Sequence, residues 1–236
     1  GMGQPGGQMG QGSGEVEQGT AATTIDTDGT YTDETYTSEG DDENALRVDG
    51  ATATLDSVTV KKTAGNTSST ENGDFYGMNA GLLATDSADV TIKNATVNTS
   101  AQNGNGIFAY GSGTKVSVSD STIKTTADNS GGIMTTGGTS LAASNLTVET
   151  DGNSAAAIRS DRGGGTVSVS GGSFTSNGTN SPAVYSTADI SVEDATLTAN
   201  GSEALVIEGK NSMKLTDCTV SGNMSDTDGA SSDENV

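Results

Sequence analysis

The sequence predicts an all-β fold: a right-handed parallel β-helix solenoid of about eight coils, with three strands per coil. A six-residue pattern that returns eight times along the chain is the first observation behind this prediction. The second is the composition, since 31% hydrophobic and 3% aromatic residues are too few for a compact two-layer domain of 236 residues. A solenoid folds with a thin core, because each coil buries only a few aliphatic side chains against its neighbours.

Each copy of the repeat has an apolar residue in first and sixth place, a turn former in third place and Thr or Ser in fifth place. The copies are YTDETY from Tyr31, LDSVTV from Leu55, IKNATV from Ile92, VSDSTI from Val118, ASNLTV from Ala143, VSGGSF from Val169, VEDATL from Val192 and LTDCTV from Leu215. Their starts are separated by 24, 37, 26, 25, 26, 23 and 23 residues. The long second step predicts an insertion near Lys61–Asn79.

The repeat predicts two strands joined by a sharp bend. Third-place residue types tolerate left-handed backbone, and they are Asp33, Ser57, Asn94, Asp120, Asn145, Gly171, Asp194 and Asp217. Before the bend, Val90 and Ile92 point inward and Thr91 outward; after it, Ala95 and Val97 point inward. Stacking predicts one buried column of Val90, Val116, Leu141, Val167, Ile190 and Met213, and another of Val97, Ile123, Val148, Phe174, Leu197 and Val220.

A third strand precedes each repeat, usually after a Gly- or Asn-rich turn. Its predicted inward column is Leu46, Leu83, Phe108, Met134, Ile158, Val184 and Leu205. Its predicted outward column is Arg47, Ala84, Ala109, Thr135, Arg159, Tyr185 and Val206. Variable loops and most coils of 23–26 residues favour a right-handed solenoid, since left-handed β-helices need strict hexapeptides.

The chain divides into a Gly/Gln-rich flexible linker (1–20), the β-helix (21–225) and an acidic tail (226–236) that we expect to be truncated. A net charge of −21 argues against nucleic acid and anionic membrane surfaces as partners. No apolar run is long enough for a membrane span, so no membrane insertion is expected. Histidine is absent and Cys218 is the single cysteine, which excludes His-based chemistry and an internal disulfide. We expect a monomer.

The repeat, the Asn/Asp bends and the Gly-rich loops resemble the pectate-lyase-like superfamily of right-handed parallel β-helices. Segments such as DENALRVDGATATLD, NSGGIMTTGG, AAAIRSDRGGG and SEALVIEGKNS are most similar to adhesin-like surface proteins of Gram-positive gut anaerobes. The resemblance covers residues 21–225. It implies a secreted or cell-surface-anchored extracellular protein, but the fold hosts lyases, glycosidases, adhesins and glycan-binding modules alike.

The candidate ligand-binding residues are Arg159, Asp161, Arg162 and Tyr185. The first three lie in the run RSDRGGG, where a charged loop leaves a strand, and Tyr185 occupies the same column as Arg159 one coil later. A guanidinium beside an aromatic ring suits a sugar, whose faces are apolar and whose edge is hydroxylated. The alternatives are that the Lys61–Asn79 insertion or the N-terminal linker covers this face, or that the charged loop is only a salt-bridged structural feature.

Catalytic and metal sites are not predicted. Pectate lyases of the resembled superfamily use an Arg or Lys base with carboxylates that hold calcium, and no row of carboxylates accompanies Arg159 on adjacent coils. The acidic segment DTDGTYTDE from Asp26 leaves calcium open as a cofactor, although it lacks the spacing of an EF-hand loop. An outward Thr column also leaves ice binding open, but the neighbouring column carries charges at Lys61, Lys124 and Glu149 that disfavour it.

The sequence therefore favours an extracellular adhesin-like or carbohydrate-binding module without catalytic activity. Its expected partner is a glycan or another host or cell-surface ligand. A polysaccharide lyase or glycoside hydrolase on the same fold, and a passive cell-surface spacer, are the alternatives.

Overall fold

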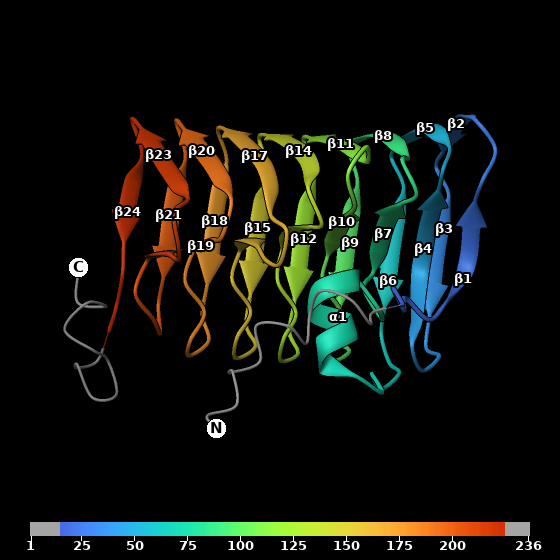
Figure 1. The fold of residues 1–236 in the computed structure, drawn as a ribbon, viewed down its shortest axis with the longest axis horizontal. Coiled ribbons are helices and arrows are strands. Elements are labelled where there is room, and N and C mark those ends of the chain that lie inside the picture. Colours follow the sequence, from blue (N-terminus) through green and yellow to red (C-terminus); the bar gives the residue numbers. More distant parts are fainter. Residues whose placement is uncertain (1–14, 225–236) are drawn as a thin grey trace, which may run out of the picture.

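The computed structural model describes residues 15–224, which form 24 strands and the short helix α1 (Thr70–Tyr76). The strands stack as successive coils along one axis, with α1 lying against the side of the solenoid (Figure 1). Three parallel sheets of eight strands run along this axis, one strand of each sheet per coil. The fold class, coil number and strands per coil predicted from the sequence are confirmed. The acidic tail at 226–236 and most of the linker expected at 1–20 lie outside the described residues.

Every sheet contains each third strand of the chain. The first sheet is β1 (Thr20–Ile25), β4 (Glu43–Asp49), β7 (Leu82–Thr85), β10 (Ile107–Tyr110), β13 (Ile133–Thr136), β16 (Ile158–Ser160), β19 (Val184–Ser186) and β22 (Leu205–Ile207). The second is β2 (Gly29–Thr32), β5 (Thr52–Asp56), β8 (Asp89–Lys93), β11 (Lys115–Ser119), β14 (Thr139–Ser144), β17 (Gly165–Ser170), β20 (Asp189–Glu193) and β23 (Ser212–Thr216). The third is β3 (Thr35–Ser38), β6 (Thr59–Lys62), β9 (Thr96–Thr99), β12 (Thr122–Thr125), β15 (Thr147–Thr150), β18 (Ser173–Ser176), β21 (Thr196–Ala199) and β24 (Thr219–Ser221).

The bend between the second and third sheets falls at the third place of the repeat in every coil. All eight residues there have positive φ, from 50° at Asp120 to 72° at Gly171. Asn, Asp and Gly reach this left-handed backbone most easily, which explains their prevalence at this place. The fifth-place Thr or Ser then opens each strand of the third sheet, from Thr35 to Thr219.

The predicted interior columns of the second and third sheets are buried along most of their length. Val148, Phe174 and Leu197 are almost inaccessible, as are their partners on the second sheet. The prediction is wrong at the C-terminal end, where Val220 is 39% exposed and Met213 is only partly buried. These residues belong to the last described coil, which has a neighbouring coil on one side only among the described residues.

The predicted columns of the first sheet are shifted by one residue in its middle strands. The inward column is Leu46, Leu82, Ile107, Ile133, Ile158, Val184 and Leu205, and all of these but the partly buried Leu205 are buried. The outward column is Arg47, Leu83, Phe108, Met134, Arg159, Tyr185 and Val206. Ala84, Ala109 and Thr135, predicted to face outward, instead lie in register with Val48 and Ser160. Adjacent apolar residues such as Leu82 and Leu83 gave no alternation from which to choose the inward one.

A ladder of buried hydroxyl groups closes the turn after the third sheet. The hydroxyl of Thr125 donates to the carbonyl of Ser130 at 2.6 Å, and the hydroxyl of Thr150 donates to the carbonyl of Ala155 at 2.5 Å. Thr99 and Ser176 repeat the same five-residue bond, at 2.5 Å in each case. These hydrogen bonds satisfy backbone carbonyls that are removed from water, and each stabilises the turn that leads into the first sheet.

We expect Val148→Asp to unfold the central coils. Val148 is 1% exposed, so the substitution places an unpaired carboxylate in a core only one side chain deep. The loss of unfolding free energy should exceed about 4 kcal/mol, which is at the upper end for single substitutions. Thr147→Asp, which changes an exposed residue of the same strand, is the control. Chemical denaturation followed by circular dichroism measures both, and a near-wild-type midpoint for Val148→Asp would refute the register.

Candidate functional site

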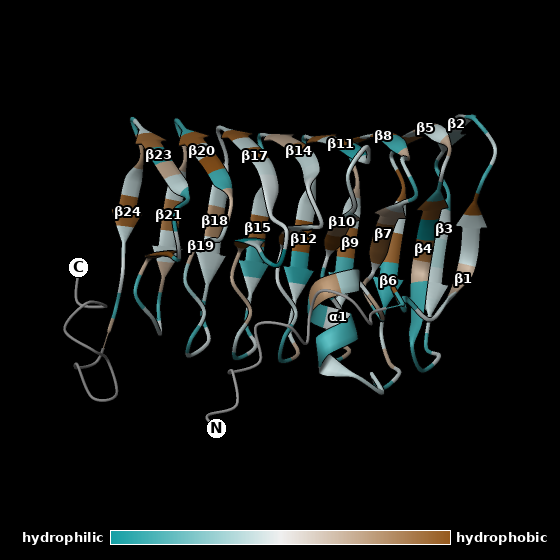
Figure 2. Cartoon of the chain, in the orientation of Figure 1, coloured by the Kyte–Doolittle hydropathy of each residue, from teal (hydrophilic) through white to brown (hydrophobic). Residues whose placement is uncertain are grey.

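The insertion between β6 and β7 contains α1 and covers part of the first sheet's outer face. The helix begins after Ser69, whose hydroxyl accepts a hydrogen bond from the amide of Asn72, and it ends at Gly77, with a φ of +82°. Beneath it, Leu83, Phe108 and Met134 form an apolar cluster with Ala80, separate from the solenoid core. Figure 2 shows hydrophobic positions on β7 and β10 beside the helix. The alternative that the insertion covers this face is therefore correct for the middle coils.

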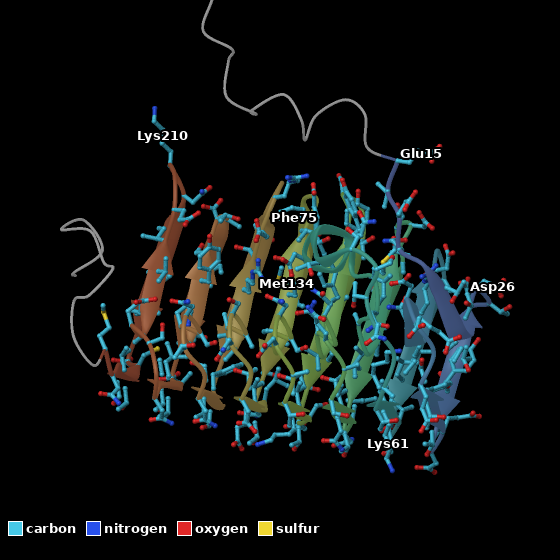
Figure 3. All side chains as sticks on the ribbon, turned by 90° about the horizontal axis from the view of Figure 1, so that it is seen from below. Glu15, Asp26, Lys61, Phe75, Met134 and Lys210 are labelled. Atoms are coloured by element: carbon cyan, nitrogen blue, oxygen red, sulfur yellow. The ribbon has the colours of Figure 1, made fainter. Side chains whose placement is uncertain are left out.

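Polar contacts fix the insertion onto the solenoid. The hydroxyl of Thr136 donates to the carbonyl of Phe75 at 2.6 Å. The Asn44 side chain donates to the carbonyls of Gly77 and Ala80 at 2.9 and 3.1 Å. The rings of Tyr76 and Tyr110 meet edge to face, with centroids 5.6 Å apart. In Figure 3, Phe75 lies on the opposite side of the solenoid from Lys61. The helix is thus held in one position rather than lying loosely on the sheet.

Arg162 belongs to this attachment. Its guanidinium carbon lies 3.8 Å from the centroid of the Phe75 ring, within cation–π range, and its Nη1 atom lies 3.5 Å from Oε1 of Glu71. The sequence placed Arg162 in a ligand-binding group with Arg159, Asp161 and Tyr185. In the structure Arg162 contacts α1 instead, and it does not line the pocket described below.

Arg159 and Asp161 form a partly buried ion pair at the edge of the helix. Nη2 of Arg159 lies 2.5 Å from Oδ2 of Asp161, and the two side chains are 15% and 19% exposed. Nη1 of Arg159 faces Oδ1 of Asp74 at 3.8 Å, while the amide of Asn103 donates to that same oxygen at 2.9 Å. Asp74 on α1 and Arg159 on β16 therefore join the insertion to the strand through charge.

Burial, with a smaller contribution from the nearby Asp161 carboxylate, raises the pKa of the Asp74 carboxyl to about 6. Arg159 and the hydrogen bond from Asn103 act in the opposite direction without cancelling the effect of burial. At neutral pH Asp74 is therefore ionised but poorly hydrated. Such a carboxylate gains more than an exposed one from any cation or donor that a ligand brings to it.

A pocket of about 250 Å³ opens beside this ion pair. It is lined by Asp74, Asn129, Ser154, Ala156, Arg159, Asn180, Pro182 and Tyr185. Tyr185 lies on the coil after Arg159, and the two residues are in register on neighbouring strands of the first sheet. The guanidinium carbon of Arg159 lies 5.7 Å from the Tyr185 ring centroid. Burial, together with the neighbouring carboxylate of Glu208, raises the pKa of the Tyr185 hydroxyl, so it remains a hydrogen-bond donor at neutral pH.

Three pocket residues come from the turns that lead into the first sheet. Asn129, Ser154 and Asn180 hold the same left-handed position on successive coils, with φ of 55°, 53° and 50°. Their side chains stand in a row at the pocket wall and form no hydrogen bond to another described residue. The sequence analysis missed this row, although Asn or Ser shortly before each first-sheet strand is a visible turn signal. It also missed Asp74, because no local pattern reveals where an inserted helix docks.

Residues 15–224 contain neither a cluster of metal-ligating side chains nor a membrane-spanning helix. Within that range, no three His, Cys, Asp or Glu side chains come together in a way that could hold a metal ion. Over the same range, no helix has the length and hydrophobicity needed to span a bilayer.

Comparison with known protein families gives a match to a β-helix family. The family model described as "Right handed beta helix region" matches residues 44–235. No curated protein and no solved structure matches the chain. The family match agrees with the handedness predicted from the coil lengths and with the parallel sheets of the structure. The chain belongs to the right-handed β-helix family.

Proposed function

We propose that this protein is an extracellular, adhesin-like or carbohydrate-binding module without catalytic activity, and that its ligand binds in the pocket beside Arg159 and Tyr185. The observation that carries the proposal is the combination of surfaces in that pocket. Pro182 and the ring of Tyr185 supply apolar area, while a row of turn side chains and the Asp74 carboxylate supply donors and acceptors. A sugar ring presents the matching combination of apolar faces and a hydroxylated edge.

A second hollow on the molecule supports a ligand less well. It has a volume of about 400 Å³ and lies on the outer face of the second sheet, where Thr91, Ser117, Ala142 and Ser168 are among its lining residues. All of its lining residues are small or β-branched, without a charged or aromatic group to orient a ligand. Because the hollow lies on the second sheet and lacks such groups, it serves as the control surface for binding experiments.

Polysaccharide cleavage is the second candidate function, and one observation favours it. Asp74 has a pKa raised to about 6 and lies close to Asp161, an arrangement that resembles a general acid near a second carboxylate. Against this, Arg159 forms an ion pair with Asp161 and is not free to act as a base.

The protein would also serve as a passive surface spacer if no ligand bound at all. We propose a secreted or surface-anchored monomer, with a glycan or cell-surface ligand as partner.

We expect Tyr185→Ala to weaken glycan binding at least tenfold, because it removes the apolar ring that one face of the sugar would cover. Tyr185→Phe keeps the ring and should retain most of the affinity. Ser168→Ala, in the hollow on the second sheet, should leave the glycan affinity unchanged. A glycan array screened with and without calcium identifies the ligand, and calorimetric titration of the three variants measures the effect. Unchanged affinity of Tyr185→Ala would move the site elsewhere.

No turnover is expected on any glycan that binds. Incubation of the protein with the bound glycan, followed by detection of unsaturated products and new reducing ends, measures lyase and hydrolase activity together. A product that forms steadily and is lost on Asp74→Asn or Arg159→Ala would establish the enzyme alternative. Calcium should leave both binding and this baseline unaltered.

A further inference from the structure

Negative charge exceeds positive charge around the pocket. Four carboxylates surround it or the adjoining attachment, those of Glu71, Asp74, Asp161 and Glu208, against the guanidinium groups of Arg159 and Arg162. Both guanidinium groups already have partners, since Arg162 contacts Glu71 and Phe75 and Arg159 pairs with Asp161. The pocket therefore lacks a free cation among the described residues.

Asp74 is the acceptor left without a strong partner inside the pocket. Its Oδ1 atom takes the hydrogen bond from Asn103, and the 3.8 Å separation from Arg159 is too long for a hydrogen bond. No described residue hydrogen-bonds its Oδ2 atom, and the side chain lines the pocket with 19% of its surface exposed. A charged donor reaching Oδ2 would form a charge-assisted hydrogen bond in a poorly hydrated setting, where such bonds are strongest.

We propose that the pocket selects a sugar that carries a free, positively charged amino group, with Asp74 as the partner of the ammonium. This inference rests on the proposed glycan-binding function and names the class of sugar. A uronic acid would bring a carboxylate against Asp74 and Asp161 in a protein of net charge −21, which is repulsive. A neutral or N-acetylated sugar would leave the Asp74 carboxylate without a cation.

The size of the pocket agrees with a single ring as the selected unit. Its volume of about 250 Å³ lies just below the usual range for pockets that hold drug-sized ligands. Asn129, Ser154 and Asn180 supply uncharged hydrogen-bonding groups on three successive coils, which suit the hydroxyls of the same ring or its neighbours. The preference for an ammonium group therefore applies only to the sugar substituent that contacts Asp74. The other pocket residues can hydrogen-bond the hydroxyls of uncharged sugars.

The test compares four tetrasaccharides of one backbone: glucosamine, N-acetylglucosamine, glucose and a glucuronate-containing form. The wild-type protein should bind the glucosamine tetramer at least tenfold more tightly than the glucose and N-acetylglucosamine tetramers, and the glucuronate form most weakly. Asp74→Asn should abolish the preference, so that the variant binds the glucosamine and glucose tetramers with equal affinity. Asn preserves the acceptor for Asn103, and thermal melting checks that the variant is folded.

A matched variant separates a specific contact from general attraction of a cation to an acidic protein. Asp120→Asn removes the same charge at the exposed bend between β11 and β12, where φ is 50° and Asn fits without strain. It should keep the full glucosamine preference, also in high salt, where unspecific charge attraction is screened. Equal loss of preference in Asp120→Asn and Asp74→Asn would overturn the inference.

The pH dependence of glucosamine binding gives a second test, which requires no variant. With a pKa of about 6, Asp74 becomes mostly protonated between pH 6 and pH 5, where the amino groups of the glucosamine tetramer are already charged, so glucosamine binding should weaken over that interval. Glucose binding should change little, although the charged groups of Arg159 and Asp161 lie close to Asp74. Binding of all neutral tetramers without an amino preference would overturn this inference and leave the proposed function intact. Binding of none of the four, with an array that is also negative, would overturn both.

Discussion

The register between neighbouring coils is the constraint on which the rest of the molecule depends. Each coil hydrogen-bonds to the next through three parallel strands, and the interior is one layer of aliphatic side chains thick. A coil that bent one residue early would turn its apolar residues to solvent and break three strand pairings at once. The eight left-handed residues between the second and third sheets prevent this, since they set the bend at the same place in every coil.

This constraint explains which parts of the structure the sequence could predict. Two of the three sheets alternate cleanly between apolar and hydroxyl side chains, as in Val116, Ser117 and Val118, so their inward columns were predicted correctly except in the last described coil. The first sheet was predicted one residue out of place in its middle strands because Ile107 and Phe108 are both apolar and both buried. Phe108 is buried by the α1 insertion, which lies outside the solenoid. The alternation of side chains along a strand does not show whether another element packs on its outer face.

The candidate site, too, could be predicted only in part from the sequence. Arg159 and Tyr185 were placed together correctly from the repeat alone, because both lie where their strands are in register. Asp74 was beyond the reach of sequence reasoning, since its position depends on how α1 packs on Leu83, Phe108 and Met134. The insertion thus has two consequences: it covers the apolar part of the outer face, and it brings a carboxylate to the edge of the part that stays open. Arg162 connects the two by holding α1 against the loop after β16.

The most direct test of this account locates the ligand on the folded protein. Backbone amide resonances of the 23.3 kDa chain can be followed by NMR during titration with the glycan that binds most tightly. The account predicts that the largest shifts fall on Asn129, Ser154, Asn180 and Tyr185, with smaller shifts along α1. Shifts concentrated instead around Ser144 and Ser168 on the second sheet would contradict it, because they would place the ligand on the outer face of another sheet.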